Sequence, residues 1–92
     1  FGRTPKINQG KGRDHYPNAF SAVLAGGGIK GGQAVGTTSK DGMTVEEKPV
    51  QVLDFLGTAI HALGIDPDTQ NMSNVGRPIR VVDRGATPIK EV

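Results

Sequence analysis

The sequence contains no cysteine and no tryptophan. The missing cysteines exclude disulfide bonds, thiolate metal sites and cysteine nucleophiles, and they leave the cellular compartment undetermined. Aromatic residues make up only 4% of the chain and hydrophobic residues together 35%, so large side chains that could fill a core are scarce. In 92 residues we therefore expect one small domain, or a piece of one, with a thin aliphatic core.

Long apolar runs and a strong net charge are also lacking. The longest apolar run, around residues 21–25, is far too short to span a bilayer, and no signal-peptide pattern opens the chain. The net charge of +2 and the rarity of aromatic residues argue against a nucleic-acid partner. Basic side chains nevertheless concentrate in residues 1–40, which places an anion-binding surface there; a solvated basic loop is the alternative.

The order of the expected elements is typical of an α/β fold. Residues 1–18 show no periodicity and are expected to form an extended loop. The apolar run at residues 21–25 predicts a strand buried on both faces of a parallel sheet. Residues 33–46 predict a minor hairpin around an Asp-Gly turn. Residues 79–82 predict a late strand, joined to the first by a parallel crossover.

The clearest signal is a helix over residues 50–63. Its apolar residues recur at intervals of three and four, Pro49 suits the first turn, and Gly64 suits the left-handed position after the last turn. The polar side chains fall on the other side of this helix, so we interpret His61 as a residue that faces solvent rather than as a ligand.

Two adjacent residues near the start of the chain suit a metal. Asp14 and His15 offer a carboxylate oxygen and an imidazole nitrogen, which are ligands of divalent cations. An ion pair between Arg13 and Asp14, with His15 stacked near Tyr16 and Pro17, explains the same residues without a metal. A complete metal site needs three or more ligands, so the pair alone does not establish one.

Three basic residues suit a tetrahedral anion. Arg3 and Arg13 carry forked donors that match sulfate or phosphate, and Lys30 adds a point charge within the glycine-rich residues 26–32. These glycines follow neither the P-loop nor the dinucleotide-binding spacing, and positive φ angles are the alternative explanation for them. No serine or threonine has the neighbours of an activated nucleophile, so no catalytic residue is predicted within the chain.

Several separated motifs, taken in order, resemble one known family. The segments "FGRTPKIN", "GRDHYP", "SAVLAGGGIKGG", "VGTTSKDG", "LGTAIHALGIDP", "GRPIRVV" and "GATPIKEV" look like the C-terminal portion of the bacterial domain-of-unknown-function family 1501. That family is similar to sulfatases and belongs to the alkaline-phosphatase-like superfamily. The resemblance covers essentially the whole chain and implies that residues 1–92 are a single partial domain, the C-terminal segment of a larger one.

The resemblance also implies a fold and a site. The superfamily has a parallel sheet between helices, two metal sites and an upstream nucleophile. His15 then stands at a metal-ligand position, with Asp14 as a weaker companion and zinc, calcium or magnesium as the ion. Phe1 stands where better-studied relatives carry a histidine ligand, which implies that one metal site is altered. Relatives are often exported, which suggests a periplasmic location.

Two functions are compatible with these residues. In the first, the parent protein is a metal-dependent hydrolase of sulfate or phosphate esters, Arg3 or Arg13 stabilises the developing anion, and the 92-residue piece is inactive alone. In the second, the chain is a non-catalytic module that retains the sulfatase-like fold and binds an anionic glycan or a protein. In either case we expect self-association or a missing upstream segment to cover an exposed strand edge.

Overall fold

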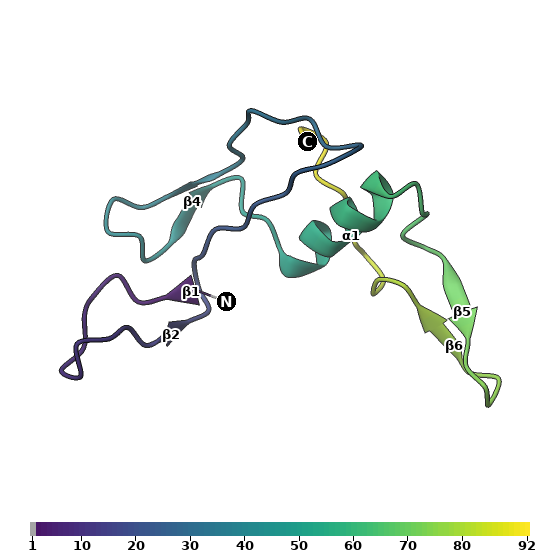
Figure 1. Cartoon of the computed structure of the whole chain (residues 1–92), viewed down its shortest axis with the longest axis horizontal. Helices are drawn as coiled ribbons and strands as arrows, with labels where there is room; N and C mark the ends of the chain where they lie inside the picture. The colour runs from purple at the N-terminus through teal and green to yellow at the C-terminus, as the bar shows by residue number, and fades with distance from the viewer. Residues whose placement is uncertain (1) are drawn as a thin grey trace. The chain divides into compact units, whose positions relative to one another are not determined.

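The computed structural model describes residues 2–92 and divides the chain into two compact units (Figure 1). Unit 1 consists of the chain up to Val23 together with Ala34–Pro49. Unit 2 consists of Leu24–Gln33 together with Val50–Val92. The described residues form one helix and three two-stranded antiparallel sheets, which confirms mixed α/β content.

Unit 1 contains two short hairpins. Strand β1 (Gly2–Arg3) pairs with β2 (His15–Tyr16), and β3 (Thr37–Thr38) pairs with β4 (Val45–Glu47). The β3–β4 pair confirms the predicted hairpin over residues 33–46, and its last strand ends one residue later, at Glu47. The β1–β2 pair lies where only a loop was expected, because strands of two residues are too short to show an alternating pattern.

Hydrogen bonds from side chains hold unit 1 together. The Tyr16 hydroxyl donates to the carbonyl of Met43 at 2.7 Å and so links the two hairpins. In the turn of the second hairpin, the Ser39 hydroxyl donates to Oδ1 of Asp41 at 2.6 Å, and the Met43 N–H donates to the same oxygen at 3.1 Å. These two bonds, the Ser39 bond first, lower the pKa of Asp41 below its usual value of 3.8.

We expect Ser39→Ala to raise the pKa of Asp41 toward 3.8, because the hydroxyl that stabilises the carboxylate is lost. In the intact chain the folded pKa lies below the unfolded one, so Asp41 stabilises this turn above about pH 4 and loses that contribution as the pH falls through its folded pKa. An NMR titration of the Asp41 carboxyl carbon measures the Asp41 pKa in the unaltered chain and in the Ser39→Ala variant. Ser21→Ala, in an irregular exposed segment, is the control; an unchanged Asp41 pKa in Ser39→Ala would contradict the assignment.

Unit 2 is built around helix α1 (Val52–Ala62), which confirms the helix predicted over residues 50–63. The helix ends as the sequence indicates: Gly64 has a φ of 78°, and its N–H donates to the carbonyl of His61 at 2.9 Å. The N–H of the following residue reaches back to Ile60 at 3.2 Å, which completes a Schellman motif. The start of the helix differs from the prediction, because Pro49 comes before the N-cap residue Gln51 and does not lie in the first turn.

The predicted parallel crossover is wrong for the described residues. The late strand expected at residues 79–82 is β6 (Pro78–Arg80), and it pairs antiparallel with β5 (Gln70–Met72), a segment for which the sequence predicted no strand. Residues 21–25 form no strand, and Val23 is 89% exposed. A strand buried on both faces needs strands beside it, and the sheets within residues 2–92 are isolated antiparallel hairpins.

The core is as thin as the composition predicts. Among the described residues, the buried hydrophobic side chains are Ala19 and Val82, and no side chain is fully buried. The apolar side of α1 is only partly covered, because Val52, Leu56 and Leu63 are exposed, whereas Leu53 and Ile60 are half-buried. The buried side chain of the helix nevertheless lies on its polar side: Thr58 is only 4% exposed.

Candidate functional site

Four of the five predicted metal and anion residues, namely Arg3, Arg13, Asp14 and His15, lie in the β1–β2 hairpin of unit 1. In the register of this hairpin Gly2 lies opposite Tyr16, and Arg3 lies opposite His15. One position further, the N–H of Thr4 donates to the carbonyl of Asp14 at 3.0 Å. We call residues 2–16 the basic hairpin.

The register decides which side chains share a face. Because Thr4 bonds to the Asp14 carbonyl, the neighbouring pair of Arg3 and His15 is the type without main-chain bonds between its members, in which side chains lie closest. Both residues are exposed, so this face is open to solvent. Successive side chains of an extended chain point to opposite faces, so Asp14 belongs to the other face from His15.

The guanidinium groups of both arginines hold the backbone of the basic hairpin. Nη1 of Arg13 donates to the carbonyls of Thr4 and Pro5, at 2.8 and 2.5 Å. In return, Nη1 of Arg3 donates to the carbonyl of Arg13 at 3.0 Å. Within residues 2–92, Arg13 thus binds main-chain carbonyls instead of forming the ion pair with Asp14 that was the alternative to a metal.

Asn8 organises the loop and went unnoticed in the sequence. Its Oδ1 accepts the N–H of Gly12 at 3.0 Å, and its Nδ2 donates to Oδ1 of Asp14 at 3.0 Å. The main-chain N–H of Asn8 also donates to the carbonyl of Gly12, and its carbonyl accepts the N–H of Lys11. An asparagine within a glycine-rich loop is the signal for such a turn, because its short amide can bond to nearby main-chain groups.

Lys30 belongs to unit 2, whereas the other predicted site residues belong to unit 1. Its carbonyl accepts a hydrogen bond from Gln33 at 3.0 Å. Two residues earlier, Gly28 approaches the carbonyl of Ala62 at the end of α1. The C-terminal end of a helix carries partial negative charge, which disfavours an anion there and supports the turn explanation for the glycines. Gly26, Gly28 and Gly32 indeed have positive φ angles.

Neither unit assembles a metal centre from the residues described. No group of three or more His, Asp or Glu side chains within residues 2–92 could hold a metal ion. The site implied for Phe1 lies outside the described residues. Residues 2–92 therefore offer at most part of a ligand set.

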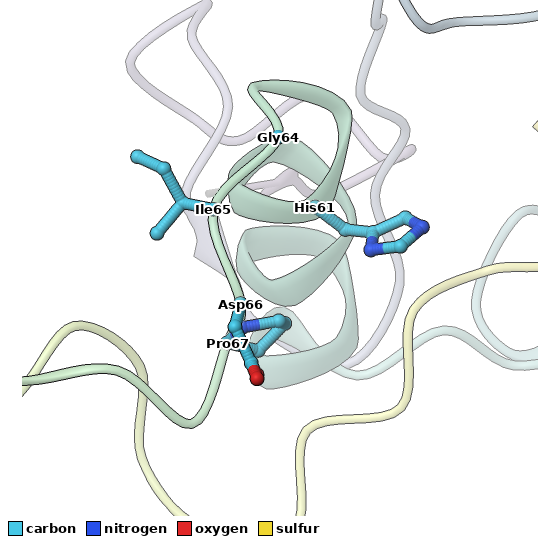
Figure 2. Close-up of a pocket in the computed structure, with 5 residues that line it drawn as sticks. All are labelled: His61, Gly64, Ile65, Asp66 and Pro67. Carbon is cyan, nitrogen blue, oxygen red and sulfur yellow. The ribbon is translucent and has the colours of Figure 1, made fainter.

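A concave surface in unit 2 lies at the end of α1 (Figure 2). It has a volume of about 400 Å³ and is lined by His61, Gly64, Ile65, Asp66 and Pro67. His61 is exposed, as expected, and its ring and the Ile65 side chain point to opposite sides of the turn in Figure 2. One imidazole and one carboxylate are too few for a metal site.

The comparisons with known proteins agree with the resemblance of the motifs. The family model described as "Protein of unknown function (DUF1501)" matches residues 1–92, which is the whole chain. The chain belongs to the DUF1501 family. The comparisons of this DUF1501 chain with curated proteins and with solved structures return no match. No helix in residues 2–92 is both long and apolar enough to cross a membrane.

Proposed function

We propose that this DUF1501 chain is part of a sulfatase-like, metal-dependent hydrolase of sulfate or phosphate esters, and that the basic hairpin binds the anionic group. The observation that carries this proposal is the register that sets Arg3 directly opposite His15 on one exposed face. A guanidinium and an imidazole side by side can donate hydrogen bonds to two oxygens of one tetrahedral anion.

Each residue of the basic hairpin has a separate role in this proposal. Arg3 and His15 contact the anion, and Arg13 positions Arg3 because the Arg3 guanidinium bonds to the Arg13 carbonyl. The residues present fit a metal only in part, since His15 lies on this face and Asp14 on the other. The proposal therefore needs further metal ligands and a nucleophile from outside these 92 residues, and no chemical step is assigned to the metal here.

We expect Arg3→Ala to weaken sulfate binding about tenfold, which corresponds to the loss of one charge-assisted hydrogen bond of about 1.5 kcal/mol. Titration of the 92-residue chain with sodium sulfate, followed by the NMR shifts of the hairpin amides, measures the affinity. Lys6→Ala removes an equal charge from an exposed site in the same loop and serves as the control. Equal losses in both variants would show that the effect is non-specific screening rather than a site.

A non-catalytic anion-binding module is the second candidate. It is favoured by the two guanidinium groups that already hold main-chain carbonyls, because such groups bind and position but supply no nucleophile. The two functions separate in an assay with aryl sulfates and aryl phosphates, carried out on the complete parent protein with zinc, calcium or magnesium added. Turnover favours the hydrolase, whereas sulfate binding without turnover favours the module.

A further inference from the structure

The polar side of α1 holds an irregular segment of unit 2, residues 86–91, which we call the strap; its first four residues form neither helix nor turn. The N–H of Thr87 donates to Oδ1 of Asp54 at 2.8 Å, and the N–H of Ile89 donates to Oγ1 of Thr58 at 2.8 Å. Further along, Nε2 of Gln33 donates to the carbonyl of Glu91 at 2.6 Å. Figure 1 shows the strap as the yellow trace that passes α1. Side chains of the helix thus bind the main chain of the strap.

The spacing of these bonds follows from the two backbones. Residues four apart on a helix are about 6 Å apart along its axis, and alternate N–H groups of an extended chain are about 6.6 Å apart. Asp54 and Thr58 therefore match Thr87 and Ile89 when an extended chain runs along the helix. Any extended segment with N–H groups on two alternate residues can therefore bond to Asp54 and Thr58 in the same way.

The chemistry of the helix face restricts which segment fits. The Thr58 hydroxyl donates its proton to the Asp54 carbonyl at 2.6 Å, so its oxygen is left to accept an N–H. A Cβ built at Gly57 would lie 3.0 Å from Cβ of Ala86, so Ala86 of the strap packs closely against this glycine. Pro88 lies between the two donors, where the absence of an N–H costs nothing.

The strap is held mainly by hydrogen bonds. Thr87 is exposed, Pro88 and Ile89 are only half-buried, and Thr58 beneath them is buried. Segments with few buried apolar contacts open at low free-energy cost compared with the fold as a whole. Opening would bare the hydroxyl of Thr58 and the carboxylate of Asp54, and both would then need new donors.

We propose that the Asp54–Gly57–Thr58 face of α1 is a binding surface for an extended segment of the pattern small–x–Pro–x, and that the strap of a second copy of the chain takes the place of the chain's own. The strap already seated on the face identifies the occupant, because a second copy presents the same N–H groups and the same small residue. The linker within one chain sets an effective concentration on the order of 1 mM, so exchange is concentration-dependent.

Cysteine cross-linking tests the exchange, because the chain has no cysteine of its own. A chain with Gly57→Cys is mixed with a chain with Ala86→Cys at about 1 mM and oxidised; exchange predicts a disulfide-linked heterodimer at least ten times more abundant than in a mixture at about 10 µM, well below the effective concentration. Gly57→Cys mixed with Asn74→Cys, at the exposed tip of the β5–β6 hairpin, measures random collision. A heterodimer yield no higher than this background overturns the proposal.

A second measurement avoids any effect of the substitutions on folding. Isotope-labelled and unlabelled copies of the unaltered chain are mixed, and an isotope-filtered NOE experiment detects contacts between Thr58 of one copy and Ile89 of the other. Intermolecular NOEs that grow with concentration support exchange. Contacts confined to single copies, or no contact between these residues at all, overturn it.

Discussion

Gly28→Ala is expected to destabilise unit 2 by about 3 kcal/mol. Gly28 has a φ of 78°, a left-handed conformation in which a side chain is strained. A Cβ at this position would also lie 2.6 Å from the carbonyl oxygen of Ala62, at the end of α1. The substitution therefore combines backbone strain with a steric clash that only a movement of the helix end or of the turn can relieve.

Urea unfolding followed by helical circular dichroism measures this effect, because α1 is the one helix in the described residues and lies in unit 2. Gly27→Ala is the matched control, since it changes the adjacent glycine, which has an ordinary φ and no atom within 4 Å of a built Cβ. Superimposable unfolding curves for Gly28→Ala and Gly27→Ala would contradict the packing of this turn on the helix.

Gly2→Ala is expected to destabilise unit 1 by about 2 kcal/mol through overpacking. Gly2 is buried, and a Cβ there would lie 2.6 Å from the carbonyl oxygens of both Ala19 and Tyr16 and 2.8 Å from Cβ of Phe20. Main-chain oxygens cannot turn aside as a flexible side chain can. The pairing of β1 with β2 would have to loosen to admit the methyl group.

The fluorescence of Tyr16 reports this change specifically. It is the only tyrosine of a chain without tryptophan, it lies in β2, and its hydroxyl bonds to Met43 within unit 1. Gly10→Ala is the control in the same hairpin, because its built Cβ meets only Oδ1 of Asn8, at 3.4 Å. A Gly2→Ala chain that keeps the unfolding midpoint of the Gly10→Ala chain would show that β1 does not pack as described.

The elements that the sequence predicted are those with strong local signals. Helix α1 has apolar residues at helical spacing over three turns and a glycine at its end, and the β3–β4 hairpin has an Asp-Gly turn. Strands β1, β2 and β5, which were not predicted, have two or three residues each, and such short strands carry no period. The parallel strand at residues 21–25 was inferred from an apolar run alone, and apolarity does not specify a strand's partners.

For the candidate site, the sequence supplied the residues but not their arrangement. Arg3 and His15 are twelve positions apart, and only the register of the hairpin sets them opposite each other. That register depends on the loop bonds of Asn8, which composition and spacing do not reveal. The metal role of His15, with Asp14 as a weaker companion, was what the family resemblance implied; adjacency on an extended chain places the two side chains on opposite faces, and the sequence alone does not show this.

The polar side of α1 shows a second limit of pattern reading. A polar stripe ordinarily indicates solvent, and this holds for His61. It fails for Thr58, because the N–H of Ile89 in an irregular segment needs an acceptor and finds one on the helix. The sequence pattern of the helix does not distinguish a threonine that is buried because it accepts a main-chain N–H from a threonine that faces water.

The partial exposure of the apolar side of α1 has a thermodynamic consequence. Because Val52, Leu56 and Leu63 are already exposed in the folded chain, these side chains add little newly hydrated apolar surface when the helix melts. The heat capacity of unfolding scales with newly hydrated apolar surface, so it should be small for unit 2. A small heat capacity gives a stability curve with little curvature, and unit 2 should therefore show no cold-induced weakening of the kind that hydrophobic cores produce.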